Sequence, residues 1–118
     1  MKKFFSIITL CLLFISCEKV PNLLVPSSEV PNWLKDRISA DEKKIESNPQ
    51  SGLDFAAWIR YKYHDAYYFE YHNVISSAGP ETYDFTGNKI LYTQEPYLNF
   101  ETEKCCKEFV WKGPSYFD

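Results

Sequence analysis

The stretch between residues 55 and 74 gives the strongest indication of fold in this sequence. In its first half, from Phe55 to Tyr63, apolar and aromatic residues hold the odd-numbered positions. This period of two is that of a β-strand and not of a helix. The alternation restarts at Tyr67, after His64-Asp65-Ala66, so the sequence predicts two antiparallel strands joined by a short loop.

The residues around that loop suggest a register for the hairpin. Pairing Tyr63 with Tyr67 sets odd-numbered residues opposite odd-numbered ones. Arg60 then lies opposite Glu70, a charge pair that contributes roughly 0.2–1 kcal/mol. Residues paired in this way share one face of the sheet, and the odd face is expected to face the core. Its members are Phe55, Ile59, Tyr61 and Phe69.

Segments on either side of the hairpin complete a small domain. Apolar residues at three-and-four spacing predict a helix over residues 31–47. The stripe consists of Trp33, Leu34, Ile38, Asp41 and Ile45. Asp84 and Gly87 suit the turn of a second hairpin, and residues 107–112 can supply a last strand. We expect an α+β domain over residues 32–118, with one N-terminal helix packed on an antiparallel sheet of four to five strands.

The N-terminus carries a targeting signal. Lys2-Lys3 precedes an apolar run over residues 4–15, which is too short for a membrane-spanning helix. The run ends in Phe-Ile-Ser-Cys at positions 14–17, which resembles the lipobox of bacterial lipoproteins. The resemblance implies that a signal peptide of residues 1–16 is removed, that the sulfur of Cys17 is diacylated and that the new N-terminus is acylated.

Lipidation would hold the protein at a bacterial membrane. One acyl chain, such as palmitate, gives only marginal binding, whereas two or three hold a domain almost permanently. Residues 18–31 contain three prolines, which exclude a helix or a central strand. We therefore expect residues 17–31 to form the lipidated cysteine and an extended tether. The expected location is the cell envelope, at the outer membrane, on its periplasmic side or at the surface.

The order of these elements resembles a family of small Bacteroidetes lipoproteins of unknown function. Three segments carry the resemblance: Tyr67-Tyr68-Phe69, residues 83–88, and Phe109-Val110-Trp111. Family members have a Cys-Cys pair soon after the aromatic strand, whereas here the pair comes late. The resemblance implies a lipid anchor and a helix-plus-sheet domain, and it implies no activity.

The charge balance bears on the class of partner. Without residues 1–16 the chain has 11 basic and 16 acidic side chains. A mildly acidic domain without a basic cluster does not suit nucleic acid or electrostatic binding to anionic lipid. We expect no nucleic-acid partner and no cofactor. The expected contacts are with the membrane, through the lipid anchor, and with a protein or a glycan.

Cys105-Cys106 is the chemically unusual feature of the chain. Adjacent α-carbons lie about 3.8 Å apart, whereas ordinary disulfides take roughly 4.4–6.8 Å. Four interpretations are open: a vicinal disulfide or two buried thiols in a surface turn, a redox pair, a soft-metal site, and a disulfide to another chain. The structural interpretation is favoured, because the flanking lysines supply no base for an activated thiolate. His64 and His72 lack metal-ligand spacing, so we expect no metal.

Aromatic residues make up 18% of the chain, a high share for a small domain. In the expected register Trp58 pairs with His72, and Tyr68 lies on the same outer face. Exposed aromatic side chains can stack on sugars or anchor a protein. Trp58, Tyr68 and His72 are therefore the candidate ligand contacts. The alternative is that a second layer, such as residues 94–106, covers them.

The sequence favours a non-enzymatic, membrane-anchored binding or accessory domain. A structural envelope component is one alternative. A small thiol-dependent or hydrolytic enzyme is the other, because a cysteine and a histidine that are distant in sequence can meet in a fold. We assign no catalytic residue: His64 is expected at a loop tip, and His72 is expected to pack on Trp58.

Overall fold

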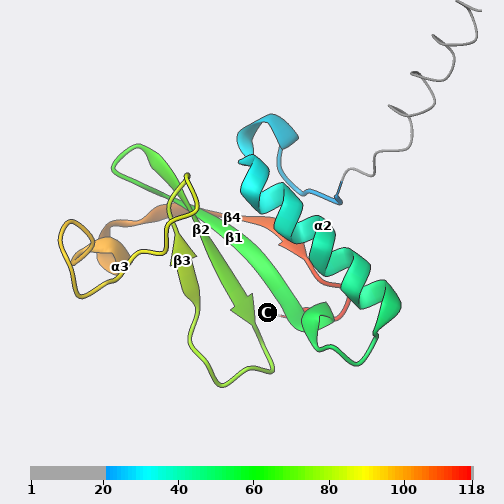
Figure 1. The fold of residues 1–118 in the computed structure, drawn as a ribbon. Helices are drawn as coiled ribbons and strands as arrows, with labels where there is room; N and C mark the ends of the chain where they lie inside the picture. Colours follow the sequence, from blue (N-terminus) through cyan, green and yellow to red (C-terminus); the bar gives the residue numbers. More distant parts are fainter. Residues whose placement is uncertain (1–20, 118) are drawn as a thin grey trace, which may run out of the picture.

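The computed structural model describes residues 21–117, in which one main helix packs on a four-stranded antiparallel sheet (Figure 1). The strands are β1 (Ala56–Tyr63), β2 (Ala66–Asn73), β3 (Glu81–Tyr83) and β4 (Cys105–Lys112), in the order β3-β2-β1-β4. The helices are α2 (Asn32–Ser47), the single turn α3 (Phe100–Glu103), and the 3-10 turns η1 (Ser27–Glu29) and η2 (Leu53–Phe55). The predicted α+β class is confirmed. The predicted signal peptide and Cys17 lie outside the described residues.

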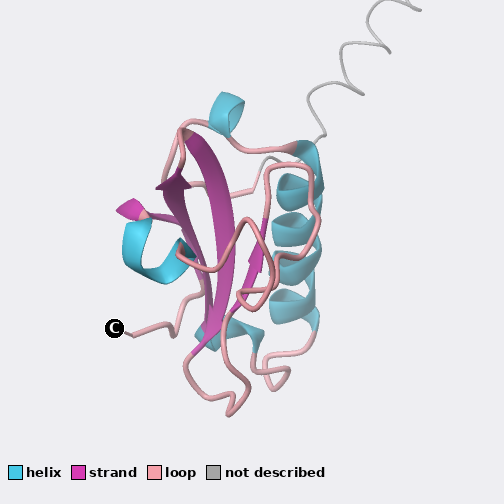
Figure 2. Ribbon diagram, turned by 90° about the vertical axis from the view of Figure 1, so that its left-hand side faces the viewer, coloured by secondary structure: helices cyan, strands magenta, loops and turns pink. Residues whose placement is uncertain are grey.

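The main helix, α2, forms where the sequence predicts it. Pro31 precedes the first turn with an extended ψ of 152°, and a proline is tolerated at a helix start because no N–H is needed there. Leu34 and Ile38 lie one turn apart and are buried against the sheet. We call the sheet surface beneath α2 the helix face. Figure 2 shows the sheet between α2 on one side and α3 on the other.

The β1–β2 hairpin is one residue out of the predicted register. Tyr63 pairs with Ala66 and not with Tyr67, so the turn contains only His64 and Asp65. Both turn residues have positive φ, 49° and 62°, as in the type I′ turn that matches the twist of paired strands. Such turns usually contain Asn or Gly, and the His-Asp pair therefore gave no sign of a two-residue loop.

This shift changes which residues share a face. A one-residue slip moves all of β2 to the other face relative to β1. Arg60 lies opposite Phe69, and Glu70 lies opposite Ile59, so the predicted Arg60–Glu70 pair is wrong. Phe69 faces α2, as predicted, but it does so beside Trp58. The prediction that Ile59 and the other odd-numbered residues of β1 face the helix is wrong.

The helix face carries the larger core. Its fully buried side chains include Leu34, Ile38, Trp58, Phe69 and Val110. Trp33 packs edge-on against Trp58 and Phe69, with centroids 6.0 and 6.1 Å apart. The Arg37 guanidinium lies 5.2 Å from the centroid of the Trp58 ring. Two side chains of α2 therefore cover Trp58.

The opposite surface of the sheet, which we call the α3 face, has a second core. Tyr63, Ile90 and Phe100 are buried there, and Tyr68, Tyr92 and Tyr97 pack around them. The Phe100 ring lies 5.1 Å from Tyr63 and 5.3 Å from Tyr68, measured between centroids. The structure thus follows the alternative in which the segment 94–106 forms a second layer over the aromatic residues of β2.

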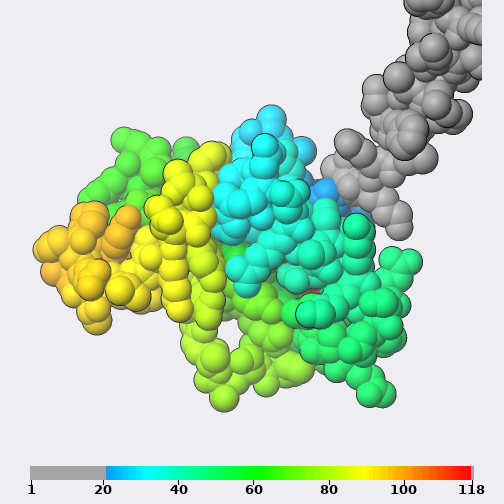
Figure 3. All heavy atoms as spheres, viewed as in Figure 1, coloured from blue at the N-terminus to red at the C-terminus, as the bar shows by residue number. Residues whose placement is uncertain are grey.

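The predicted second hairpin is present only in part. The turn forms as expected: Asp84 Oδ1 accepts hydrogen bonds of 2.9 Å from the backbone N–H groups of Thr86 and Asn88. Gly87 takes the left-handed conformation, with φ 97°. Beyond the turn, pairing with β3 is reduced to a single bridge at Lys89. Figure 3 shows this loop lying against the first turns of α2, where Trp33 Nε1 donates a hydrogen bond of 2.9 Å to its backbone.

The described part of the predicted tether packs on the domain. Its apolar side chains Leu23, Val25 and Val30 contact the helix-face core. The N–H of Leu24 donates a hydrogen bond of 2.9 Å to the carbonyl of Val110 in β4. The extended tether expected over residues 17–31 therefore does not include residues 21–31, which pack on the folded domain. The prolines exclude a long helix or a central strand there, but the apolar side chains between them are still stabilised by burial.

Candidate functional site

The structure separates the three side chains predicted to contact a ligand. Trp58 lies on the helix face with 0% of its area exposed, beneath Trp33 and Arg37. It cannot contact a ligand in this fold, so that prediction is wrong, and His72 does not pack on it. The cause is the register shift, which carries Trp58 to the face opposite Tyr68 and His72.

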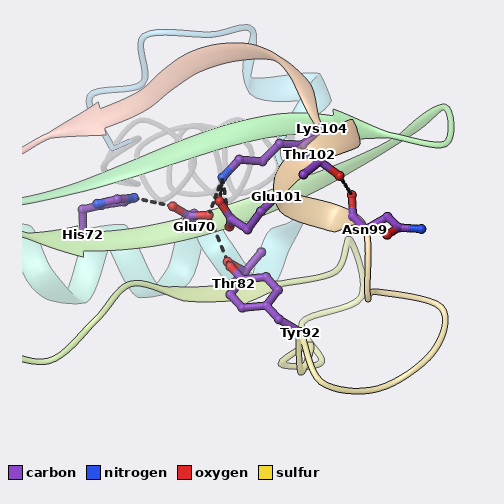
Figure 4. Close-up of polar contacts among 8 residues, drawn as sticks. All are labelled: Glu70, His72, Thr82, Tyr92, Asn99, Glu101, Thr102 and Lys104. Carbon is purple, nitrogen blue, oxygen red and sulfur yellow. Dashed lines mark hydrogen bonds and ion pairs between the residues drawn. The ribbon is translucent and has the colours of Figure 1, made fainter.

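The polar contacts of the α3 face converge on the carboxylate of Glu70 (Figure 4). Glu70 lies in β2 and is 2% exposed. Its Oε1 is hydrogen bonded to Nε2 of His72. Its Oε2 accepts a hydrogen bond of 3.0 Å from the hydroxyl of Thr82 in β3 and lies 3.5 Å from Nζ of Lys104. Both carboxylate oxygens are therefore engaged.

Further contacts hold the partners of Glu70 in place. The hydroxyl of Thr82 is hydrogen bonded to that of Tyr92. The ammonium of Lys104 contacts Glu101 at 3.2 Å and lies 4.0 Å from the centroid of the Tyr61 ring. These side chains come from β1, β3, α3 and the loop before α3. The cluster therefore fastens the α3 segment to the sheet.

The single turn of α3 sets the position of Lys104. The carbonyl of Asn99 accepts hydrogen bonds from the N–H of Glu103 at 2.9 Å and from the hydroxyl of Thr102 at 3.1 Å. The N–H of Lys104 donates to the carbonyl of Phe100 at 2.9 Å. Because the Phe100 ring is buried between tyrosines, the turn is held against the sheet, and Lys104, the residue that follows the turn, reaches Glu70.

The environment of Glu70 keeps its carboxylate charged. Burial alone would raise the pKa of Glu70, because it penalises the charged form. Hydrogen bonds from His72 and Thr82 and the positive charge of Lys104 outweigh burial, so the pKa lies below its usual value of 4.5. At neutral pH the cluster is built around an ionised carboxylate.

The neighbouring tyrosines are protonated at neutral pH. Burial, followed by the negative charges of Glu70 and Glu101, raises the pKa of Tyr61 to about 12. Burial likewise raises the pKa of Tyr92 to about 12, although its hydrogen bond to Thr82 acts in the opposite direction. Neither phenol therefore supplies a phenolate nucleophile or a base near pH 7.

The chemistry open to this cluster is limited. A His–Glu pair can serve as a general base when a nucleophile lies within hydrogen-bonding reach. The hydroxyl of Thr82, however, donates its proton to Glu70. The imidazole of His72 stays partly accessible, with 31% of its side chain exposed. The arrangement is that of a satisfied polar cluster with one partly exposed imidazole.

Cys105 and Cys106 form a disulfide with each other at the start of β4. Both are exposed, and Cys105 lies opposite Lys62 of β1. Cys106 has a positive φ of 67°, where the β1–β4 pairing is irregular, as in a β-bulge. Of the four interpretations, the structure shows the vicinal disulfide. Its location differs from the prediction, because the pair begins an edge strand and does not lie in a turn.

The Glu70 cluster was not predicted from the sequence. Arg60, the predicted partner of Glu70, is buried on the helix face. It forms ion pairs of 3.0 Å with Glu29 and 2.9 Å with Glu108. The actual partner, Lys104, is 34 positions away from Glu70 along the chain. The one available signal was a carboxylate within an aromatic strand, since a buried charge needs a partner.

Two other features of the described residues bear on function. Across residues 21–117, His, Cys, Asp and Glu side chains do not gather in groups of three or more that could hold a metal ion. A pocket of about 240 Å³ lies between α2 and the end of β4, lined by Asn22, Glu42, Ile45, Trp111, Lys112 and Pro114. This pocket is on the helix side of the domain, away from the Glu70 cluster.

Comparisons of the chain with protein-family models, with curated proteins and with solved structures found no match. The resemblance to small Bacteroidetes lipoproteins therefore stays a prediction. In the part of the chain that the structure describes, none of the helices combines the length and apolar character needed to cross a bilayer.

Proposed function

We propose that this chain is a lipid-anchored protein of the bacterial cell envelope, and that its domain binds a protein or a glycan without catalysing a reaction. The lipobox-like segment at positions 14–17 supports the anchor, because a diacylated and N-acylated Cys17 would remain at the membrane. The proposed location is the outer membrane, on its periplasmic side or at the surface. The resemblance to small lipoproteins supports the anchor.

The state of Glu70 supports binding over catalysis. A general base must be free to take a proton from a substrate or nucleophile. The Glu70 carboxylate is buried and already engaged by His72, Thr82 and Lys104. Its contacts instead hold the α3 segment and the imidazole of His72 in fixed positions.

His72 is the observation that carries the binding proposal. Its side chain is 31% exposed, and Glu70 holds its ring in place. A side chain fixed before binding loses little conformational entropy when a ligand arrives. Tyr68 lies on the same face and is half-buried beside Phe100. These two residues are the proposed contacts.

Photo-crosslinking in cells tests this proposal. A photoreactive residue in place of His72 should give covalent adducts with an envelope protein or glycan. The matched control replaces His64, an exposed histidine at the hairpin turn, and should give none. Binding to purified peptidoglycan should fall in His72→Ala and not in His64→Ala if the ligand is a glycan. Equal adducts at both positions, or none at position 72 together with unchanged glycan binding, would contradict the proposal.

A further inference from the structure

The N-terminal segment is fixed to the domain almost from the first described residue. The N–H of Asn22 donates a hydrogen bond of 3.3 Å to Oε2 of Glu42 in α2. The N–H of Leu24 donates to the carbonyl of Val110 in β4 at 2.9 Å. Glu29 forms an ion pair of 3.0 Å with the buried Arg60. The domain therefore begins at Asn22, and not after residue 31.

This packing limits the distance between the domain and the lipid. From Cys17 to Asn22 there are five Cα–Cα steps, which span at most about 18 Å when fully extended. The 16 residues of α2 alone make a helix about 24 Å long. The greatest reach of the linker is therefore shorter than the domain that it carries.

The geometry points to a membrane-apposed domain, in which the surface around Asn22 rests against the lipid headgroups. We name this the anchor surface, and it comprises Asn22, Leu24, Lys112 and Pro114. The inference rests on the proposed acylation of Cys17. It places the domain directly against the bilayer and not at a distance from it. The partner of the anchor surface is the headgroup layer of the membrane that holds the acyl chains.

The anchor surface suits this contact. Leu24 is 61% exposed, whereas its neighbours Leu23 and Val25 pack on the core, so it presents an apolar side chain beside the linker. The pocket described above opens beside Asn22. The Glu42 carboxylate in its wall accepts a hydrogen bond of 3.2 Å from Trp111 Nε1 as well as the one from Asn22. That negative charge is therefore engaged within the protein.

The same geometry turns the far end of the sheet toward the aqueous side. Trp58 of β1 pairs with Trp111 beside the anchor surface, and the hairpin turn lies beyond the other end of β1. The length of β1 between Trp58 and the turn places the turn about 20 Å from Trp58. The hairpin turn lies at that far end (Figure 1), and so does Cys105, which pairs with Lys62 near the end of β1.

Quenching by lipid headgroups tests the inference on the full-length, acylated protein in phosphatidylcholine vesicles. A fluorophore is attached through an introduced azide-bearing residue, either at Lys112 or at Asp65 in the hairpin turn. A short-range quencher on the lipid headgroup should reduce the emission of the label at position 112 several-fold more than that at position 65. Inserting ten Gly/Ser residues between Val20 and Pro21 should abolish most of this difference, because a flexible linker of that length frees the domain.

The outcomes separate this inference from the proposed function. Intact-mass measurement first establishes whether Cys17 carries acyl groups. An unacylated protein overturns the proposed anchor and this inference with it. An acylated protein with equal quenching at both positions, or with stronger quenching at position 65, overturns only the membrane-apposed arrangement.

Discussion

The two faces of the sheet are covered in different ways. On the helix face, four turns of α2 place Leu34 and Ile38 over Trp58 and Phe69, so coverage comes from apolar and aromatic packing. On the α3 face, a loop and one helical turn are held by the buried Phe100 ring and by contacts to Glu70. The helix face is covered by many apolar contacts spread along α2. The α3 face is covered through the Phe100 ring and a few directional contacts to Glu70.

This difference has consequences for stability. Burial of apolar area is non-directional and does not depend on protonation. The contacts of Glu70 are directional and require its charge. We therefore expect the helix face to determine the global free energy of unfolding, whereas the α3 face responds to pH and can open locally.

The largest effect is expected from Phe69→Ala, which removes a buried ring from the helix face. Such substitutions lower the free energy of unfolding by about 3–5 kcal/mol. Phe100→Ala removes a phenyl ring of the same size from the α3 face. Its effect on the free energy of unfolding should be smaller, because the α3 segment can detach while α2 stays packed. Urea unfolding followed by tryptophan fluorescence measures both, since all three tryptophans belong to the helix-face cluster. A larger loss for Phe100→Ala would show that the α3 face, and not the helix face, determines the global free energy of unfolding.

A smaller effect is expected from Glu70→Gln. The variant keeps the shape of the side chain but removes the charge that Lys104 and His72 contact. Hydrogen bonds to charged groups contribute about 1.5–3 kcal/mol each, and the cost should appear as early hydrogen exchange in residues 94–104. Glu101→Gln is the matched control, because Glu101 is 57% exposed and exposed ion pairs contribute about 0–1 kcal/mol. Equal losses in the two variants would show that burial of Glu70 adds nothing.

The two faces of the sheet should also differ in their response to pH. The folded-state pKa of Glu70 lies below the unfolded value of 4.5, so near that pH the unfolded chain binds more protons. The stability that Glu70 contributes is complete above 4.5 and is lost as pH falls through the folded pKa. Wild type should therefore lose more stability than Glu70→Gln between about pH 6 and about pH 3. Parallel acid profiles for the two proteins would contradict this account.

The smallest effect is expected from replacing both Cys105 and Cys106 by Ser. The disulfide joins neighbours at an exposed strand end, so it closes no long loop in the unfolded chain. We expect the Tm to fall by a few degrees and the photo-crosslinks at position 72 to persist. Stoichiometric, tight zinc binding by the purified domain, lost in the double variant, would show that the pair is a metal site.

Some elements of the fold could be predicted from the sequence and others could not. The helix α2 was predictable because its apolar residues repeat with the helical period, and the Asp84 turn was predictable because Asp and Gly occupy their usual positions. The hairpin register was not, since both faces of β1 and β2 are covered and hydrophobic alternation no longer distinguishes them. The two-residue turn at His64 and Asp65 has no Gly or Asn to reveal it.

The candidate site was less predictable than the fold. His72 and Tyr68 were selected on an assumed outer face, and they do lie on the face opposite α2. Trp58 was assigned to the same face, and the register shift places it in the core. The Glu70–Lys104 contact joins residues far apart in sequence through α3, a single turn with no repeating pattern. Such a contact depends on the fold as a whole and leaves no local signature.

We propose that a lipid at Cys17 holds this domain in the cell envelope, and intact-mass analysis of membrane-extracted protein tests this anchor. We expect a chain that begins at Cys17 and carries acyl groups, together with an unprocessed or soluble Cys17→Ser variant. A soluble mature form of the wild-type protein with an unmodified Cys17 thiol would contradict it.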